Sequence, residues 1–263
     1  MKGFIMANRP MDYYAKTLEK GLRILNLFDD RNSAWSLTEA AAKTGINLTS
    51  TYRLVNTFIK LGYLNKDNKS KLLRLGPMAV ALGNRILSGF DFNRLIKPLV
   101  DEIHNKYHVS IDVSLFQSGL MVQIYNIETT TTLTYHQDVI SDFLYFTATG
   151  KSVLANLPED ELEELINHQS FEIRTDQTIV NKEGLYADLV SVRERGYAIN
   201  NEEYIKGLIA IGAPILNQNT GRPIGAISFT STTLDHSLVE FEEKYSAILC
   251  DLARRLSGMT PNV

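Results

Sequence analysis

The sequence predicts a two-domain protein of the α+β class, in which short helices and a hairpin precede a larger domain of helices and antiparallel strands. Three observations support this prediction. The chain has 263 residues, more than one compact core usually organises, and 44% of them are hydrophobic. Its charge is divided unevenly between its two parts. Its periodic segments also change near residue 90, from closely spaced helices to mixed helices and strands.

Charge divides the chain near residue 90. Residues 1–90 carry 14 Lys and Arg against 6 Asp and Glu, a net charge of +8. Residues 91–263 carry 13 against 24, a net charge of −11, and together they give the −3 of the whole chain. This asymmetry indicates a polyanion-binding module joined to one that avoids polyanions, although a basic domain can also be merely soluble.

Residues 1–76 are predicted to begin with two helices. Apolar residues at helical spacing from Leu18 to Phe28 predict the first one. Ser36, followed three residues later by Glu39, predicts a capping box at the start of the second helix. Gly45 ends that helix, because glycine accepts a positive φ at little cost.

A third helix begins after Asn47, where Asn47 or Thr49 can serve as the cap, and ends near Gly62. Two short helices joined by a tight turn that contains glycine predict a helix-turn-helix. The next β-like pieces, 63–64 and 72–75, flank a polar turn with three lysines, which is typical of a wing. Pro77 suits the first turn of a helix over 77–90 that connects the domains.

The third helix is predicted to read DNA, because the major groove admits one α-helix whose first residues reach the base edges. Thr49, Ser50 and Thr51 suit capping or phosphate contacts, and Arg53 suits a base or phosphate contact. The alternative is that these residues only cap the helix or face solvent, and that the wing lysines form a solvated turn. The candidate DNA-binding residues are Ser36, Thr38, Thr49, Ser50, Thr51, Tyr52, Arg53, Asn56, Lys66, Lys69 and Lys71.

Residues 91–263 alternate between helical and strand patterns without regular βαβ spacing. They predict helices at 95–107, 150–157, 158–168, 184–195 and 237–256, and strands at 110–116, 120–127, 133–137, 197–201, 209–216 and 223–230. This order indicates a central antiparallel sheet flanked by helices.

Several classes of protein are disfavoured. The chain contains no run of about eighteen apolar residues and no secretory signal, so we expect a cytoplasmic protein without a membrane partner. The single cysteine, Cys250, cannot form an internal disulfide or a structural zinc site, and we expect a buried, inert thiol. No cofactor is expected.

Three enzyme or metal motifs are the alternatives to a DNA-binding function. Gly150-Lys151-Ser152 is similar to the end of a phosphate-binding loop, but Tyr145 occupies the position that needs a glycine. His104 and His108 are spaced to share a metal, but they lack the glutamate of the H-E-x-x-H motif. No Gly-x-Ser-x-Gly elbow is present, so an enzyme is the less favoured alternative.

The whole pattern resembles the IclR family of bacterial regulators from about Thr17 to Gly258. The matching pieces in the first domain are 37–45, 49–54, 61–63 and 74–76, and those in the second are 147–155, 195–198, 201–203, Gly207 and 211–214. Each piece is weak alone, but their order is specific. Two segments depart from the family pattern: Leu48 replaces a common basic residue, and residues 143–146 replace Pro-x-His-Ala with a bulkier aromatic sequence.

The resemblance implies a winged helix-turn-helix at 1–76, a linker helix at 77–90 and a GAF-like effector-binding domain at 91–263. It implies a dimer or a dimer of dimers that binds double-stranded operator DNA and usually represses a catabolic operon, with activation as the alternative. The effector would be a small metabolite such as a carboxylate, a sugar acid or an aromatic compound, and Thr149 and Gly150 could hold a carboxylate through their backbone N–H groups. The implied effector-binding residues are Leu133, Tyr135, Tyr145, Thr147, Ala148, Thr149, Gly150, Glu203, Gly207, Ala213, Ser228 and Thr230.

Overall fold

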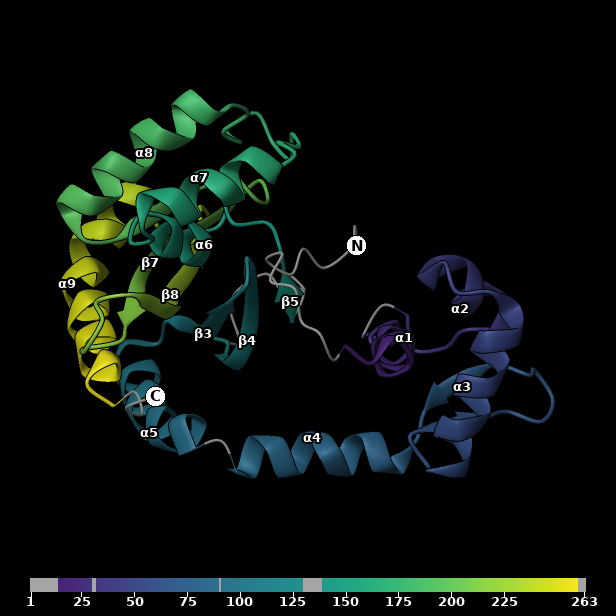
Figure 1. Cartoon of the computed structure of the whole chain (residues 1–263). Helices are drawn as coiled ribbons and strands as arrows, with labels where there is room; N and C mark the ends of the chain where they lie inside the picture. The colour runs from purple at the N-terminus through teal and green to yellow at the C-terminus, as the bar shows by residue number, and fades with distance from the viewer. Residues whose placement is uncertain (1–13, 30–31, 90, 130–138, 260–263) are drawn as a thin grey trace. The chain divides into compact units, whose positions relative to one another are not determined.

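A computed structural model describes residues 14–29, 32–89, 91–129 and 139–259 of the chain. The chain divides between residues 90 and 91 into two compact units (Figure 1). Each unit is described by itself below.

The first unit begins with three helices, α1 (Lys16–Leu25), α2 (Leu37–Thr44) and α3 (Leu48–Lys60). The predicted capping box opens α2, since the Ser36 hydroxyl accepts from the N–H of Glu39 and the Glu39 carboxylate accepts from the N–H of Ser36. The cap of α3 is Asn47, whose side chain accepts from the N–H of Ser50. The core of this unit consists of Ile24, Ile46, Val55, Leu64 and Leu73.

A two-stranded hairpin follows the helices, as the sequence predicts. It pairs β1 (Leu64–Lys66) with β2 (Leu73–Leu75) in antiparallel fashion, and Trp35 adds an isolated bridge to Leu73. The buried side chains of Leu64 and Leu73 fix the hairpin on the helices, so its turn projects away from the core. Helix α4 (Pro77–Gly89) completes the unit.

The second unit is built on an antiparallel sheet with the strand order β5-β4-β3-β8-β7-β6. The strands are β3 (Ser110–Gln117), β4 (Leu120–Ile127), β5 (Ile140–Ser141), β6 (Ala198–Asn201), β7 (Leu208–Leu216) and β8 (Pro223–Thr232). The helices are α5 (Asp91–Tyr107), α6 (Ala148–Leu154), α7 (Glu159–His168), α8 (Lys182–Arg195) and α9 (Leu238–Ser257). The predicted strand at 133–137 lies outside the described residues.

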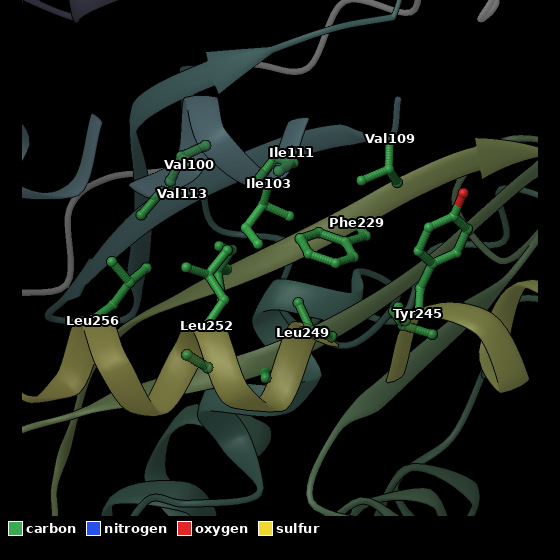
Figure 2. Packing of buried hydrophobic residues seen from close by; sticks show 14 of the residues in the cluster. Val100, Ile103, Val109, Ile111, Val113, Phe229, Tyr245, Leu249, Leu252 and Leu256 are labelled. Atoms are coloured by element: carbon green, nitrogen blue, oxygen red, sulfur yellow. The ribbon is translucent and has the colours of Figure 1, made fainter. Parts of the chain in front are cut away.

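One face of this sheet is apolar and packs against α5 and α9. The odd-numbered residues of the central strands, such as Ile111, Ile227 and Phe229, meet Tyr245, Leu249 and other side chains of the long C-terminal helix. Figure 2 shows the α9 side chains directed at the strands across this layer. Complete burial of so many large apolar groups makes this layer the main hydrophobic contribution to the stability of the unit.

The opposite face of the sheet is polar at its centre, and α6 lies on it, with α7 and α8 beyond. Its buried polar side chains come from alternate positions of three strands, and they are Ser110, Asp112, Ser114, Asn200, Ser228, Thr230 and Thr232. We call these residues the polar sheet face. Burial of this many polar groups is costly unless they are paired, so this face is the natural place for a ligand site.

Candidate functional site

The exposed face of α3 carries an unpaired set of side chains. Thr49, Tyr52, Arg53 and Asn56 follow the i, i+3, i+4, i+7 spacing of one helix face, and all four are exposed. None of them forms a side-chain hydrogen bond or an ion pair with the described residues. Side chains left free on one helix face can contact base edges and phosphates without first breaking other contacts.

Thr51 is a correction to the predicted DNA-binding set. Its side chain is fully buried, and its hydroxyl lies 3.3 Å from the carbonyl oxygen of Ile46 and 3.1 Å from that of Asn47. It therefore packs α3 on the core and cannot reach DNA from this position. Thr49 is also not the cap, because Asn47 holds that role, whereas the half-buried Ser50 lies beside the exposed face.

Thr51→Val tests this correction, because valine keeps the shape and removes the hydroxyl. We expect the free energy of unfolding of the first unit to fall by about 0.5 to 1.5 kcal/mol through the lost hydrogen bond. Affinity for DNA, measured by fluorescence anisotropy well below the melting temperature, should stay within about twofold. A tenfold loss of affinity at unchanged stability would restore Thr51 as a contact.

Ser36 and Thr38 lie at the start of α2. The Ser36 hydroxyl belongs to the capping box and is 3.2 Å from the Thr38 hydroxyl, while Thr38 is exposed. The hydrogen bonds from Ser36 lower the pKa of Glu39. Ser36 thus fixes the start of the helix, and Thr38 is the one of the two whose side chain is exposed enough for a phosphate to reach.

The wing turn is organised by Asp67, which the sequence reasoning did not single out. Its carboxylate accepts from the N–H groups of Lys69 and Ser70, at 2.9 and 2.6 Å, and from the Ser70 hydroxyl at 2.8 Å, and these bonds lower its pKa. Lys66, Lys69 and Lys71 remain exposed and form no ion pairs in the described part of the chain. The turn therefore presents three free ammonium groups.

The polar sheet face brings together the two strand residues predicted to meet an effector. Ser228 and Thr230 are alternate residues of β8 and are more than nine-tenths buried. Their hydroxyls form no hydrogen bond with any described residue. Register places Asp112 of β3 opposite Ser228, and Ser110 opposite Thr230. A buried hydroxyl without a protein partner is available to a ligand or to water.

The start of α6 lies directly over this face. A Cβ added to Gly212, which is paired with Ser228, would lie 2.6 Å from the backbone of Ala148. Only glycine therefore lets α6 approach the strand so closely. Ala148 and the buried Thr149, whose hydroxyl is also unpaired among the described residues, consequently lie beside the Ser228 row.

Gly150 and Thr147 bond to each other at the start of α6. The N–H of Gly150 donates to the Thr147 hydroxyl at 3.1 Å, and that hydroxyl is also 3.3 Å from the carbonyl of Phe143. Gly150 is buried so tightly that an added Cβ would lie 2.3 Å from the carbonyl oxygen of Leu144. The Gly150 N–H is thus already satisfied, which corrects the prediction that it holds a carboxylate.

Asp112 is the functional candidate that the sequence reasoning missed. It is buried on the polar sheet face, where it accepts from the Gln123 side-chain amide at 2.5 Å and from the Ser114 hydroxyl at 2.8 Å. Burial raises its pKa to about 6, which these two hydrogen bonds partly oppose. The signal in the sequence was the alternation Ser110-Ile-Asp112-Val-Ser114, in which polar residues occupy one face.

Ala213 is a further correction, whereas Glu203 stays a prediction, because one of its two carboxylate oxygens has no hydrogen-bond partner among the described residues. Glu203 is buried and accepts from Lys151 of α6 at 2.6 Å, and burial raises its pKa although Lys151 opposes this. Its carboxylate is therefore engaged in an ion pair. Ala213 belongs to the apolar layer with α9, because its parity in β7 is opposite to that of Gly212.

Ala213 instead helps to line a surface hollow of about 380 Å³ beside Cys250 and Arg254 of α9. Cys250 is half-buried rather than fully buried, and burial raises the pKa of its thiol. None of the buried hydroxyls of the polar sheet face lines this hollow, so it does not coincide with the candidate effector site.

The aromatic segment 143–146 forms a packed cluster. Phe146 stacks on Phe143 and on Tyr204, and the Arg174 guanidinium lies 4.9 Å from the centre of the Phe143 ring. Tyr145 is buried, and its hydroxyl donates to the Glu172 carbonyl at 2.9 Å. The Tyr145 hydroxyl is therefore not free for a ligand.

The remaining predicted effector residues are Gly207, Leu133 and Tyr135. Gly207 adopts a φ of +85° in the turn before β7, where its N–H donates to the Glu202 carboxylate at 2.6 Å, so its role is in the turn. Leu133 and Tyr135 lie outside the described residues.

The alternative motifs find no support in the geometry. Lys151, which a phosphate-binding loop would use, is buried against Glu203 and Asp188. A ring nitrogen of His104 lies 2.9 Å from the Val109 carbonyl, and no metal-binding group of three ligands occurs among the described residues. In the same part of the chain, no helix has the length and apolar character needed to cross a bilayer.

Comparison with known families decides what these two units are. Residues 17–68 match the IclR helix-turn-helix domain, and residues 84–258 match the C-terminal domain of the bacterial transcriptional regulator IclR. The chain belongs to the IclR family. As an IclR family member it is a DNA-binding transcriptional regulator, which confirms the predicted fold class and the predicted first-domain motif.

Individual relatives align with this chain over almost its full length. The chain is 27% identical over 256 residues to the HTH-type transcriptional regulator KdgR of Escherichia coli, covering 96% of this chain and 97% of that protein. It is 23% identical over 242 residues to the transcriptional repressor IclR of the same organism, and the match covers 90% of this chain and 88% of that protein. An IclR homologue from Microbacterium hydrocarbonoxydans, solved with 4-hydroxybenzoate, shares the fold with a TM-score of 0.76 at 17% identity, covering 92% and 98%.

Proposed function

We propose that this IclR family regulator represses a catabolic operon by binding operator DNA through α3 and the wing, and that a small effector on the polar sheet face modulates this binding. The observation that carries the DNA-binding part is the unpaired face of Thr49, Tyr52, Arg53 and Asn56. The relative named as a repressor supports the direction of control.

The effector part of the proposal is supported by the hydroxyls of the buried residues Ser228, Thr230 and Thr149, which form no hydrogen bond with the described residues. The solved homologue that holds 4-hydroxybenzoate shows that this fold can take a small organic molecule. A ligand that forms hydrogen bonds with these hydroxyls in one conformation of the regulator and not in another shifts the balance between the two conformations. We further propose a homo-oligomer, because a two-fold pair of recognition helices reads a palindromic site.

Arg53→Ala tests the DNA-binding part. We expect the affinity for the protein's own upstream DNA to fall by about 1 to 3 kcal/mol, roughly 5-fold to 150-fold, because a forked guanidinium contact is lost. Affinity is measured by fluorescence anisotropy at several salt concentrations, and circular dichroism checks the fold.

Arg85→Ala is the matched control, since Arg85 is an exposed arginine of α4 whose side chain bonds, among the described residues, only to the Ala81 carbonyl. This variant also removes one positive charge from the first unit, so it reports the general electrostatic effect. If the two variants lose affinity equally, the loss reflects charge alone and Arg53 has no specific contact. A flat salt dependence of the wild type would contradict counterion release as well.

A further inference from the structure

The carboxylate of Asp112 is unusual for its position on the polar sheet face. It is buried among serine and threonine side chains, and no described residue forms an ion pair with it. Its two hydrogen-bond donors, from Gln123 and Ser114, leave part of its acceptor capacity unused, because two carboxylate oxygens can accept about four hydrogen bonds. Such a carboxylate can accept further hydrogen bonds from a ligand or from water.

The neighbours of Asp112 define which donors suit the site. Ser228 of β8 lies directly opposite Asp112, and Thr230 is the next residue of β8 on the same face. The start of α6, with Thr149, lies against Gly212, which pairs with Ser228 on its other side. The hydroxyls of these residues can both donate and accept, whereas the carboxylate only accepts. A ligand hydroxyl can donate to Asp112 and accept from Ser228, whereas an ammonium group can donate to both residues but offers no acceptor to the Ser228 hydroxyl.

The charge at the site argues against an anionic group in the same place. No lysine or arginine among the described residues faces Asp112, and Lys151, on the nearby α6, is engaged by Glu203 and Asp188. A ligand carboxylate beside Asp112 would place two like charges in a buried environment, where their repulsion is poorly screened.

We propose that Asp112 is the specificity-determining residue of the effector site and accepts hydrogen bonds from a hydroxylated end of the effector, as a polyol, sugar or sugar-derived acid presents. This inference rests on the proposed effector site. It favours the sugar-like class over molecules whose only polar groups are carboxylates or amines.

The test uses three sets of small molecules with chains of four to seven carbons. The first contains polyols and aldonates such as glucitol and gluconate, the second contains unsubstituted dicarboxylates such as adipate, and the third contains diamines such as hexane-1,6-diamine. Binding to the full chain is measured by thermal shift and then by titration calorimetry. We expect binding in the first set and none in the other two.

Two variants then separate the role of Asp112 from general effects. Asp112→Asn keeps the shape and removes the charge, and we expect the affinity for a molecule of the first set to fall at least about tenfold, because charge-assisted hydrogen bonds are about twice as strong as neutral ones. Asp251→Asn removes an exposed carboxylate from α9, whose side chain pairs with Arg254, and should leave the affinity unchanged.

Each other outcome is decisive. Binding confined to the dicarboxylates or the diamines overturns the inference and leaves the proposed effector function standing, as does equal affinity of wild type and Asp112→Asn for a polyol. If none of the three sets binds the wild type, this inference is overturned, whereas the proposed effector function fails only if no small molecule, aromatic carboxylates such as 4-hydroxybenzoate included, changes the affinity for DNA.

Discussion

Replacement of Lys151 with methionine should lower the free energy of unfolding of the second unit by about 3 to 5 kcal/mol at pH 7.5, because it leaves buried carboxylates without their counter-charge. Lys151 is 1% exposed, and its ammonium lies 2.6 Å from Glu203 and 2.9 Å from Asp188. The second Glu203 oxygen is buried without a hydrogen-bond partner, so this carboxylate already depends on Lys151. Methionine has a similar length and shape, which limits the effect of altered packing.

The pH dependence of this loss has a definite sign. Burial already raises the pKa of Glu203, and removal of Lys151 raises it further. The unfolded chain ionises Glu203 at its ordinary pKa, so the penalty grows as the pH rises above that value and shrinks toward pH 5. The destabilisation should therefore be smaller at pH 5 than at pH 7.5.

The measurement is urea denaturation followed by far-UV circular dichroism. Trp35 is the single tryptophan and lies in the first unit, so its fluorescence serves as an internal control that should not change. The double variant Lys151→Met with Glu203→Gln should recover at least half of the loss, because the uncompensated charge is gone. No recovery in the double variant would mean that packing, and not charge, accounts for the effect of Lys151.

The first unit was largely predictable because its determinants are local. The capping box of Ser36 and Glu39, the stop at Gly45 and the polar wing turn are short-range signals, and the structure places all of them as expected. The prediction that Thr51 contacts DNA was wrong, because the sequence shows only that Thr51 is one of several consecutive polar residues. Only the packing of α3 reveals that its hydroxyl is directed at the backbone of Ile46 and Asn47.

The effector site was less predictable because it depends on parity and long-range pairing. Ser228 and Thr230 share one face of β8, as strand alternation requires, and both are buried there. Ala213 lies on the opposite face of the sheet, in the apolar layer, although the family resemblance implies that it contacts the effector. The ion pair of Glu203 could not be predicted from the sequence, since its partner Lys151 lies 52 residues away in the chain.

Asp112 also imposes a cost on the folded protein, which its replacement should remove. Its folded pKa of about 6 exceeds the ordinary 3.8, so the folded state binds the proton more tightly than the unfolded state does. The contribution of this group to stability therefore falls as the pH rises from about 4 to 6, and the penalty is complete above that window. At about 1.4 kcal/mol per pKa unit, the full penalty is on the order of 2 to 3 kcal/mol.

Asp112→Asn should accordingly stabilise the second unit by about 2 to 3 kcal/mol at pH 7.5 and have no effect at pH 4. The asparagine can still accept from Ser114, and the Gln123 amide can rotate to offer its oxygen, so the hydrogen bonds are kept. Urea denaturation of both proteins at pH 4, 5, 6 and 7.5 measures the difference. A variant that is no more stable than the wild type at pH 7.5 would show that the ionised Asp112 does not destabilise the folded state. A variant that is more stable but binds polyols weakly would indicate that Asp112 lowers stability and serves ligand recognition.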